Sequence, residues 1–201
     1  MADNYSENHG ANIVACAEYL YNVLWECQRD VAGWKYTFLK GNRYRIPYGQ
    51  PVDEGEYIGY PADINTFLCA AHNTESEFYS QQSYWEGTKI RSTYYAMDCS
   101  SFVSYCWDAP RTTTANWHEL DCTCLGTILH PDDLNVLQPG DALNHAADHI
   151  VLVTDVYEDG TIEIIHETIP QLKKEILSVA EIMSRFSEYS IYRYNGRANV
   201  T

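Results

Sequence analysis

The sequence predicts an α+β fold in which helices come first and antiparallel strands cluster towards the carboxyl end. Apolar side chains recur at helical spacing between residues 11 and 24, which predicts a packed amphipathic helix. Further along, the apolar runs 150–156 and 161–165 are separated by Tyr-Glu-Asp-Gly, a pattern typical of a β-hairpin. Early helices followed by clustered strands favour an antiparallel sheet.

The remaining elements are predicted from shorter patterns. Three segments are expected to be regular: a strand or extended piece over 34–38, and helices over 62–71 and 99–108. Turn-forming residues interrupt these patterns in three stretches that predict loops: 44–51, 73–97 and 111–140. Ser178 and Glu181 form a capping box that opens a helix through about Phe186, and 190–194 predicts a last strand.

Composition and charge narrow the classes of function. The 201 residues include 13 Lys plus Arg against 28 Asp plus Glu, a formal net charge of −15 with neutral histidines. Nucleic-acid binding and docking onto anionic lipid both need clustered basic side chains, so both are unfavourable here. No stretch approaches the roughly 18 apolar residues of a membrane span. The first ten residues have no basic start or apolar core, so we expect either an intracellular protein or a secreted one whose leader has been removed.

A candidate nucleophile lies in the segment 97–108. Asp98 is a good N-cap residue, which makes Cys99 the first residue of the predicted helix. A thiol at that position feels the positive end of the helix dipole, which favours the thiolate. Because Cys99 shares one helical stripe with Phe102 and Val103, it is expected to point towards the element on which the helix packs. Cys106, on the same stripe, is expected to be structural.

A candidate base lies at the start of the first predicted hairpin strand. His149 follows a Pro-Gly-Asp turn at 139–141 and begins the apolar strand, where a strand end would hold its imidazole rigidly. His145, four residues earlier in the loop, is the alternative base. A third polar group is needed to orient the imidazole.

The second hairpin strand offers His166 and Glu167 for that third role. Neighbouring residues on a strand face opposite ways, so only one of them can share the face of His149. A two-residue loop at Asp159-Gly160 selects His166, which is the register we favour, whereas a three-residue loop selects Glu167. In both registers a bulge or strand twist is needed to bring the candidate close to His149.

These blocks resemble the NlpC family of papain-like cysteine peptidases. Asp98-Cys99-Ser-Ser-Phe-Val is similar to that family's nucleophile signature, and the Pro-Gly-Asp turn followed by His149-Ile-Val-Leu-Val is similar to its histidine-led strand. His166 matches the family's third polar residue. Tyr44–Pro51 is similar to its Pro-Tyr segment, in which Tyr48 is the matching tyrosine.

The resemblance implies a papain-like NlpC fold, with N-terminal helices packed on a small antiparallel sheet. It implies one catalytic domain over 1–201, with insertions at about 51–97 and 111–140. The implied activity is hydrolysis of amide bonds in peptidoglycan stem peptides, with Cys99 as nucleophile, His149 as base and His166, or alternatively Glu167, as orienting residue. Tyr48 and Asp98 would line the substrate pocket, and Tyr94 or Tyr95 could substitute for Tyr48. No cofactor or metal is expected.

Other interpretations remain open at this level. The Cys–His pair could transfer an acyl group to an amine or alcohol, or the chain could be a non-catalytic relative that binds cell-wall peptides. The expected partners are peptidoglycan stem peptides or released muropeptides, with no nucleic acid and no membrane insertion. Secretion or association with the cell wall is expected, with the cytoplasm as the alternative. One further group has acceptable zinc-ligand chemistry, although loop cysteines are the favoured interpretation: His118, Cys122, Cys124 and His130.

Overall fold

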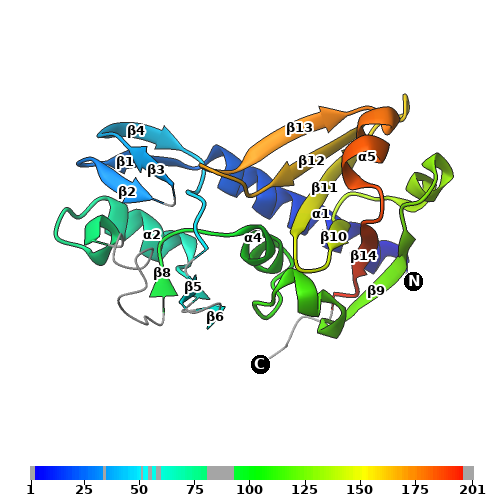
Figure 1. Ribbon diagram of the computed structural model, residues 1–201, viewed down its shortest axis with the longest axis horizontal. Coiled ribbons are helices and arrows are strands. Elements are labelled where there is room, and N and C mark those ends of the chain that lie inside the picture. The colour runs from blue at the N-terminus through cyan, green and yellow to red at the C-terminus, as the bar shows by residue number, and fades with distance from the viewer. Residues whose placement is uncertain are drawn as a thin grey trace. The chain divides into compact units, whose positions relative to one another are not determined.

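A computed structural model shows the arrangement of the chain (Figure 1). It describes residues 3–33, 35–50, 52–53, 56–57, 60–80 and 93–196. Trp34 and large parts of the expected insertion at 51–97 lie outside the described residues. The predicted α+β class is confirmed, because an N-terminal helix is combined with antiparallel sheets.

The chain divides into two compact units. The first contains Met1–Tyr19, Cys99–His166 and Lys173–Thr201, and the second contains Leu20–Asp98 and Glu167–Leu172. The long helix α1, Asp3–Asn22, runs from the first unit into the second. Of the two expected insertions, 111–140 belongs to the first unit and 51–97 to the second.

The first unit is built on an antiparallel sheet. Its six strands in the described residues are β9 (Cys122–Thr127), β10 (Ala142–His145), β11 (His149–Val156), β12 (Ile162–His166), β13 (Lys173–Leu177) and β14 (Ser190–Tyr194), in the order β13-β12-β11-β10-β14-β9. Its helical elements are α4 (Cys99–Cys106), α5 (Val179–Phe186) and the 3₁₀ turns η2 (Thr114–Glu119) and η3 (Pro131–Val136). The predicted loop over 111–140 is therefore wrong in part, because it contains β9 and both turns.

A hydrophobic core covers one face of this sheet. Val151 and Val153 of β11 and Ile164 of β12 are fully buried, and they pack with Ile182 and Phe186 of α5. The predicted capping box is confirmed, because Ser178 Oγ accepts from the Glu181 amide while the Glu181 carboxylate accepts from the Ser178 amide. The cap fixes where α5 begins and so which of its side chains face the sheet.

The β11–β12 hairpin differs from both predicted registers. The Tyr157 amide donates to the Thr161 carbonyl, so the loop spans three residues and the predicted two-residue loop is wrong. The pairing Asp155↔Glu163 then shifts to Val153↔Ile164, which leaves Thr154 as a bulge. One bulged residue reverses which side chains of β12 share a face with those of β11. The bulge thus returns His166 to the face of His149, even though a three-residue loop alone would have selected Glu167.

The second unit consists of short paired strands and helices. The strands are β1 (Leu24–Cys27), β2 (Val31–Gly33), β3 (Tyr36–Phe38), β4 (Gly41–Tyr44), β5 (Val52–Asp53), β6 (Glu56–Tyr57), β7 (Tyr60–Pro61) and β8 (Thr93–Tyr94). The helical elements are α2 (Ile64–Ala71), near the predicted 62–71, and η1 (Glu77–Ser80). Trp25, Phe67 and Phe78 form an edge-to-face aromatic core, with ring centroids 5.4–5.7 Å apart.

Candidate active site

His149 and His166 lie together on neighbouring strands of the first unit (Figure 1). The shifted register continues to place His166 opposite Val151, two residues along β11 from His149. Diagonal neighbours of this kind are within reach of long side chains. The ring centroids are 5.1 Å apart, and His149 Nε2 lies 2.8 Å from His166 Nδ1. The two histidines therefore form a hydrogen-bonded pair.

Glu175 of β13 extends this pair by a third side chain. It is opposite Ile164 and so again diagonal to His166, and its Oε1 lies 3.1 Å from His166 Nε2. Arg185 Nη2 donates to Oε1 at 2.7 Å, and Lys173 Nζ lies 2.6 Å from Oε2. The hydrogen bond from Arg185 is the largest cause that lowers the pKa of Glu175 to about 2. Glu175 is consequently an anion at neutral pH.

These contacts fix which nitrogen of each ring carries the proton. An ionised carboxylate can only accept hydrogen bonds, so His166 Nε2 donates to Glu175. Burial lowers the pKa of His166, and its neutral ring then accepts at Nδ1 from His149 Nε2. His149 is left with the lone pair at Nδ1, the form of imidazole that acts as a base.

The electrostatic environment keeps His149 in this neutral form. Burial, followed by the nearby charge of His166, lowers the pKa of His149 to about 4. Asp148 acts in the opposite direction but is outweighed. A lowered histidine pKa means that the ring is unprotonated from about pH 4 upward, so His149 is neutral across the neutral range and its imidazolium form is disfavoured.

Cys99 is the first residue of α4, as the sequence predicted. It is buried, with 9% of its surface exposed, and α4 packs against β11 and β12, the strands that carry both histidines (Figure 1). The helix ends at Cys106 instead of 108. Its predicted apolar stripe is buried, but so are Ser100, Ser101 and Ser104, so α4 is enclosed on almost every side.

Tyr189 lies near both the Cys99 end of α4 and the His149 end of β11. Burial, followed by the charges of Asp148 and Cys99, raises the pKa of Tyr189 to about 12. Because Asp148 directly precedes His149, both Cys99 and the start of β11 lie near this phenol. Its ring also contacts the ring of His145, with centroids 5.3 Å apart.

The alternative base, His145, is less well placed than His149. It ends β10 directly opposite His149 in the register, and its Nδ1 lies 3.7 Å from an Asp148 oxygen, beyond a normal hydrogen bond. No described carboxylate or histidine orients its ring as His166 orients that of His149. The hydrogen-bonded chain therefore singles out His149.

Three other predicted site residues belong to the second unit. Asp98 is fully buried and its Oδ2 accepts from the Tyr94 hydroxyl at 3.2 Å. The Tyr48 hydroxyl donates to Gln50 Oε1 at 2.9 Å, and Tyr48 forms a β-bridge with Met97. This bridge ties the backbone at Tyr48 to Met97, which precedes Cys99 by two residues in the sequence.

Glu167 is enclosed in the second unit and does not join the histidine chain. It is fully buried, and neither carboxyl oxygen has a hydrogen-bond partner among the described residues. Burial, followed by the charge of Asp98, raises the pKa of Glu167 well above its usual range. Burial therefore favours the protonated form of Glu167, while His166 occupies the orienting position.

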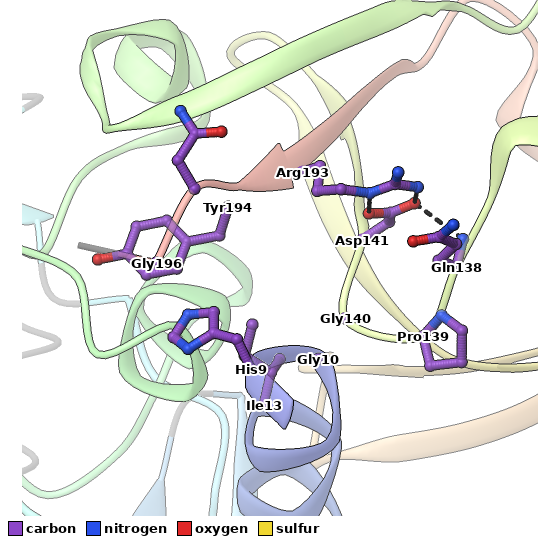
Figure 2. A pocket seen from close by; sticks show the side chains of 11 residues that line it. His9, Gly10, Ile13, Gln138, Pro139, Gly140, Asp141, Arg193, Tyr194 and Gly196 are labelled. Atoms are coloured by element: carbon purple, nitrogen blue, oxygen red, sulfur yellow. Dashed lines mark hydrogen bonds and ion pairs between the residues drawn. The ribbon is translucent and has the colours of Figure 1, made fainter. Parts of the chain in front are cut away.

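The Pro-Gly-Asp turn is held by a side chain of β14, the strand next to β10. Asp141 is almost fully buried and forms a two-pronged ion pair with Arg193 of β14, with N···O distances of 2.8 and 2.7 Å. Figure 2 shows this pair at one side of a cavity of about 310 Å³, with His9 and Tyr194 at the other. Gly140 has a φ of +97°, and its carbonyl oxygen accepts a hydrogen bond from Trp107 Nε1. The turn is therefore held by Trp107 as well as by Arg193.

The residues considered for zinc are dispersed over several elements. His118 lies in η2, Cys122 and Cys124 lie in β9, and His130 precedes η3. Within the ranges that the structure describes, no three potential ligands gather, and no disulfide joins any of the cysteines. The prediction that Cys122 and Cys124 lie in a loop is wrong, because both are residues of β9.

Comparison with known proteins adds no relative. No protein-family model, curated protein or solved structure matches the chain. In its described residues, none of the helices has the length and apolar character required to cross a membrane.

Sequence reasoning missed Glu175, Arg185 and Tyr189. Glu175 lies in the run Lys-Lys-Glu, whose charges conceal the strand β13. Its alternation was the available signal, since Leu177 is buried and Glu175 shares its face. Arg185 and Tyr189 reach the site through tertiary packing that no local pattern indicates.

Proposed function

We propose that the protein is a cysteine peptidase that hydrolyses amide bonds in peptidoglycan stem peptides. The observation that carries the reaction type is the chain His149–His166–Glu175 beside a helix that begins with Cys99. A neutral imidazole whose tautomer and orientation are fixed by a hydrogen-bonded chain is what a general base requires. The substrate class rests on the resemblance of the sequence blocks to the NlpC family.

In the proposed reaction, His149 Nδ1 accepts the thiol proton as Cys99 Sγ attacks the amide carbonyl. His166, held by the anionic Glu175, keeps the ring of His149 in the orientation and tautomer that this proton transfer requires. The backbone N–H of Cys99, at the positive end of α4, is placed to stabilise the oxyanion. His149 then delivers its proton to the leaving amine, and water hydrolyses the thioester, restoring the thiol and releasing the carboxylate.

Digestion of purified muropeptides tests this proposal. Mass spectrometry is expected to show two fragments whose summed mass exceeds that of the substrate by one water, with a new amine and a new carboxylate. A product joined to an added amine would instead indicate acyl transfer. Unchanged muropeptides in the presence of correctly folded protein would contradict the peptidase proposal.

The assignment of the orienting residue gives a second prediction. His166→Ala is expected to lower kcat by roughly 10²–10⁴, because His149 loses the acceptor that fixes its tautomer. Glu167→Gln is the control: a buried carboxyl group outside the histidine chain is replaced by an amide of similar size, and kcat should change little. The two variants are compared by initial rates on one muropeptide. Equal losses would show that His166 does not have this separate role.

A further inference from the structure

The second unit contains an open cavity of about 380 Å³, within the roughly 300–1,000 Å³ of small-ligand sites. It lies along β4, whose described partner is β1, with β3 and the segment at 170–171 forming other walls. Its polar and aromatic lining consists of two arginines, two tyrosines and two amides: Arg43, Arg45, Tyr36, Tyr44, Asn42 and Gln171.

Both arginines are held in place by uncharged oxygen atoms. Arg43 Nε and Nη2 donate to the Leu39 carbonyl at 2.9 and 2.5 Å. Arg45 Nη2 donates to the Tyr21 hydroxyl at 2.8 Å, and its guanidinium lies 4.3 Å from the centre of that ring. Neither forms an ion pair within the described part of the chain, and no carboxylate lines the cavity. In a chain with net charge −15, this is a local cationic site with donors to spare.

The remaining lining suits a ring with hydroxyl or amide groups. Tyr36 and Tyr44 are 49% and 58% exposed, so much of their ring surface is open to a ligand. The apolar face of a pyranose can pack on such rings, while the amides of Asn42 and Gln171 can pair with its hydroxyl and N-acetyl groups. A peptide would use the arginines but has less need of the two aromatic rings.

We propose that this cavity binds a pyranose sugar that carries a carboxylate, with Arg43 and Arg45 recognising the carboxylate and Tyr44 packing on the ring. That the sugar is the glycan attached to the muropeptide substrate rests on the proposed function. Within the second unit, Arg45 lines the cavity and Pro47, two residues further along, forms a β-bridge with Gln171, another residue of the lining.

Calorimetric titration of the full chain with four probes tests this site. N-acetylmuramic acid carries both ring and carboxylate, N-acetylglucosamine carries the ring without the lactyl carboxylate, and D-lactate carries the carboxylate alone. The Kd of N-acetylmuramic acid is expected to be at least tenfold lower than that of either other probe. A dipeptide of glutamate is the fourth probe.

Matched variants locate the binding. Arg43→Gln and Arg45→Gln are each expected to raise the Kd of N-acetylmuramic acid at least tenfold, and Tyr44→Ala at least fivefold. Lys40→Gln and Tyr19→Ala, which remove an exposed cation and an exposed tyrosine outside the cavity, should leave it unchanged. More than half the surface of Tyr44 is exposed, so Tyr44→Ala keeps the test valid if an arginine variant unfolds.

Two results would overturn the site: equal affinity for N-acetylglucosamine, or tighter binding of the glutamate dipeptide than of the sugar acid. The sugar-site proposal and the peptidase proposal can each be refuted without the other. Muropeptide hydrolysis without N-acetylmuramic acid binding refutes only the cavity. Binding that persists in a protein without hydrolytic activity refutes only the peptidase proposal.

Discussion

Replacement of Cys99 by alanine is expected to reduce muropeptide hydrolysis by about 10⁴-fold or more. The proposed reaction passes through a thioester on Cys99 Sγ, and alanine offers no atom that could form this bond. The fold should survive, because the substitution removes one sulfur atom from a buried helix and alanine favours the helical conformation. Initial rates by mass spectrometry and thermal unfolding measure the two effects.

Cys106→Ala is the matched control for this experiment. Cys106 lies in the same helix, is 5% exposed, and its thiol pKa is raised by burial, so it is expected to be an unreactive core residue. The Cys106→Ala protein should keep its activity. A Cys99→Ala protein that keeps most of its activity, or an equal loss in both variants, would show that Cys99 is not the nucleophile.

Arg193→Ala is expected to destabilise the protein by about 3 kcal/mol. The substitution leaves Asp141, whose side chain is 1% exposed, without its two-pronged partner, and an unpaired buried charge is strongly unfavourable. Arg193 Nη2 also donates to the Val136 carbonyl, which would lose that bond. Urea unfolding measured at constant pH gives the change in free energy.

The double variant Arg193→Ala with Asp141→Asn is the control for charge. Because the amide carries no charge, the double variant should recover part of the lost stability. Arg29→Ala removes an exposed arginine that lies 5.1 Å from the centre of the Tyr79 ring, and it should cost about 1 kcal/mol or less. Equal losses in Arg193→Ala and Arg29→Ala would contradict the structural role given to the Asp141 pair.

Local sequence patterns predicted the elements that local interactions determine. The capping box at Ser178 and Glu181 opens α5 where expected, and Cys99 is the first residue of α4. The β11–β12 hairpin was also predicted, because its β-branched runs and Asp-Gly turn act within a few residues. These patterns placed Cys99, His149 and His166 on the correct elements.

The details of the site depend on longer-range packing. The bulge at Thr154 decides which face of β12 meets His149, and no turn rule indicates it. Glu175 comes from a strand whose two preceding lysines hide its alternation, and Arg185 reaches it from α5. Such groups are identified only when the strands are placed side by side.

Alkylation of the cysteines at pH 6 tests the central proposal, the pairing of Cys99 with His149, most directly. An ordinary thiol, with a pKa of about 8.5, is almost fully protonated at pH 6. The ring of His149 is neutral at this pH because its pKa is lowered to about 4, so rapid labelling of Cys99 requires that its proton be removed locally. Peptide mapping after brief exposure to iodoacetamide should show Cys99 as the first of the seven cysteines to react. His149→Ala should slow this reaction at least tenfold. Uniform slow labelling, or a Cys99 rate unchanged by His149→Ala, would contradict the catalytic pair.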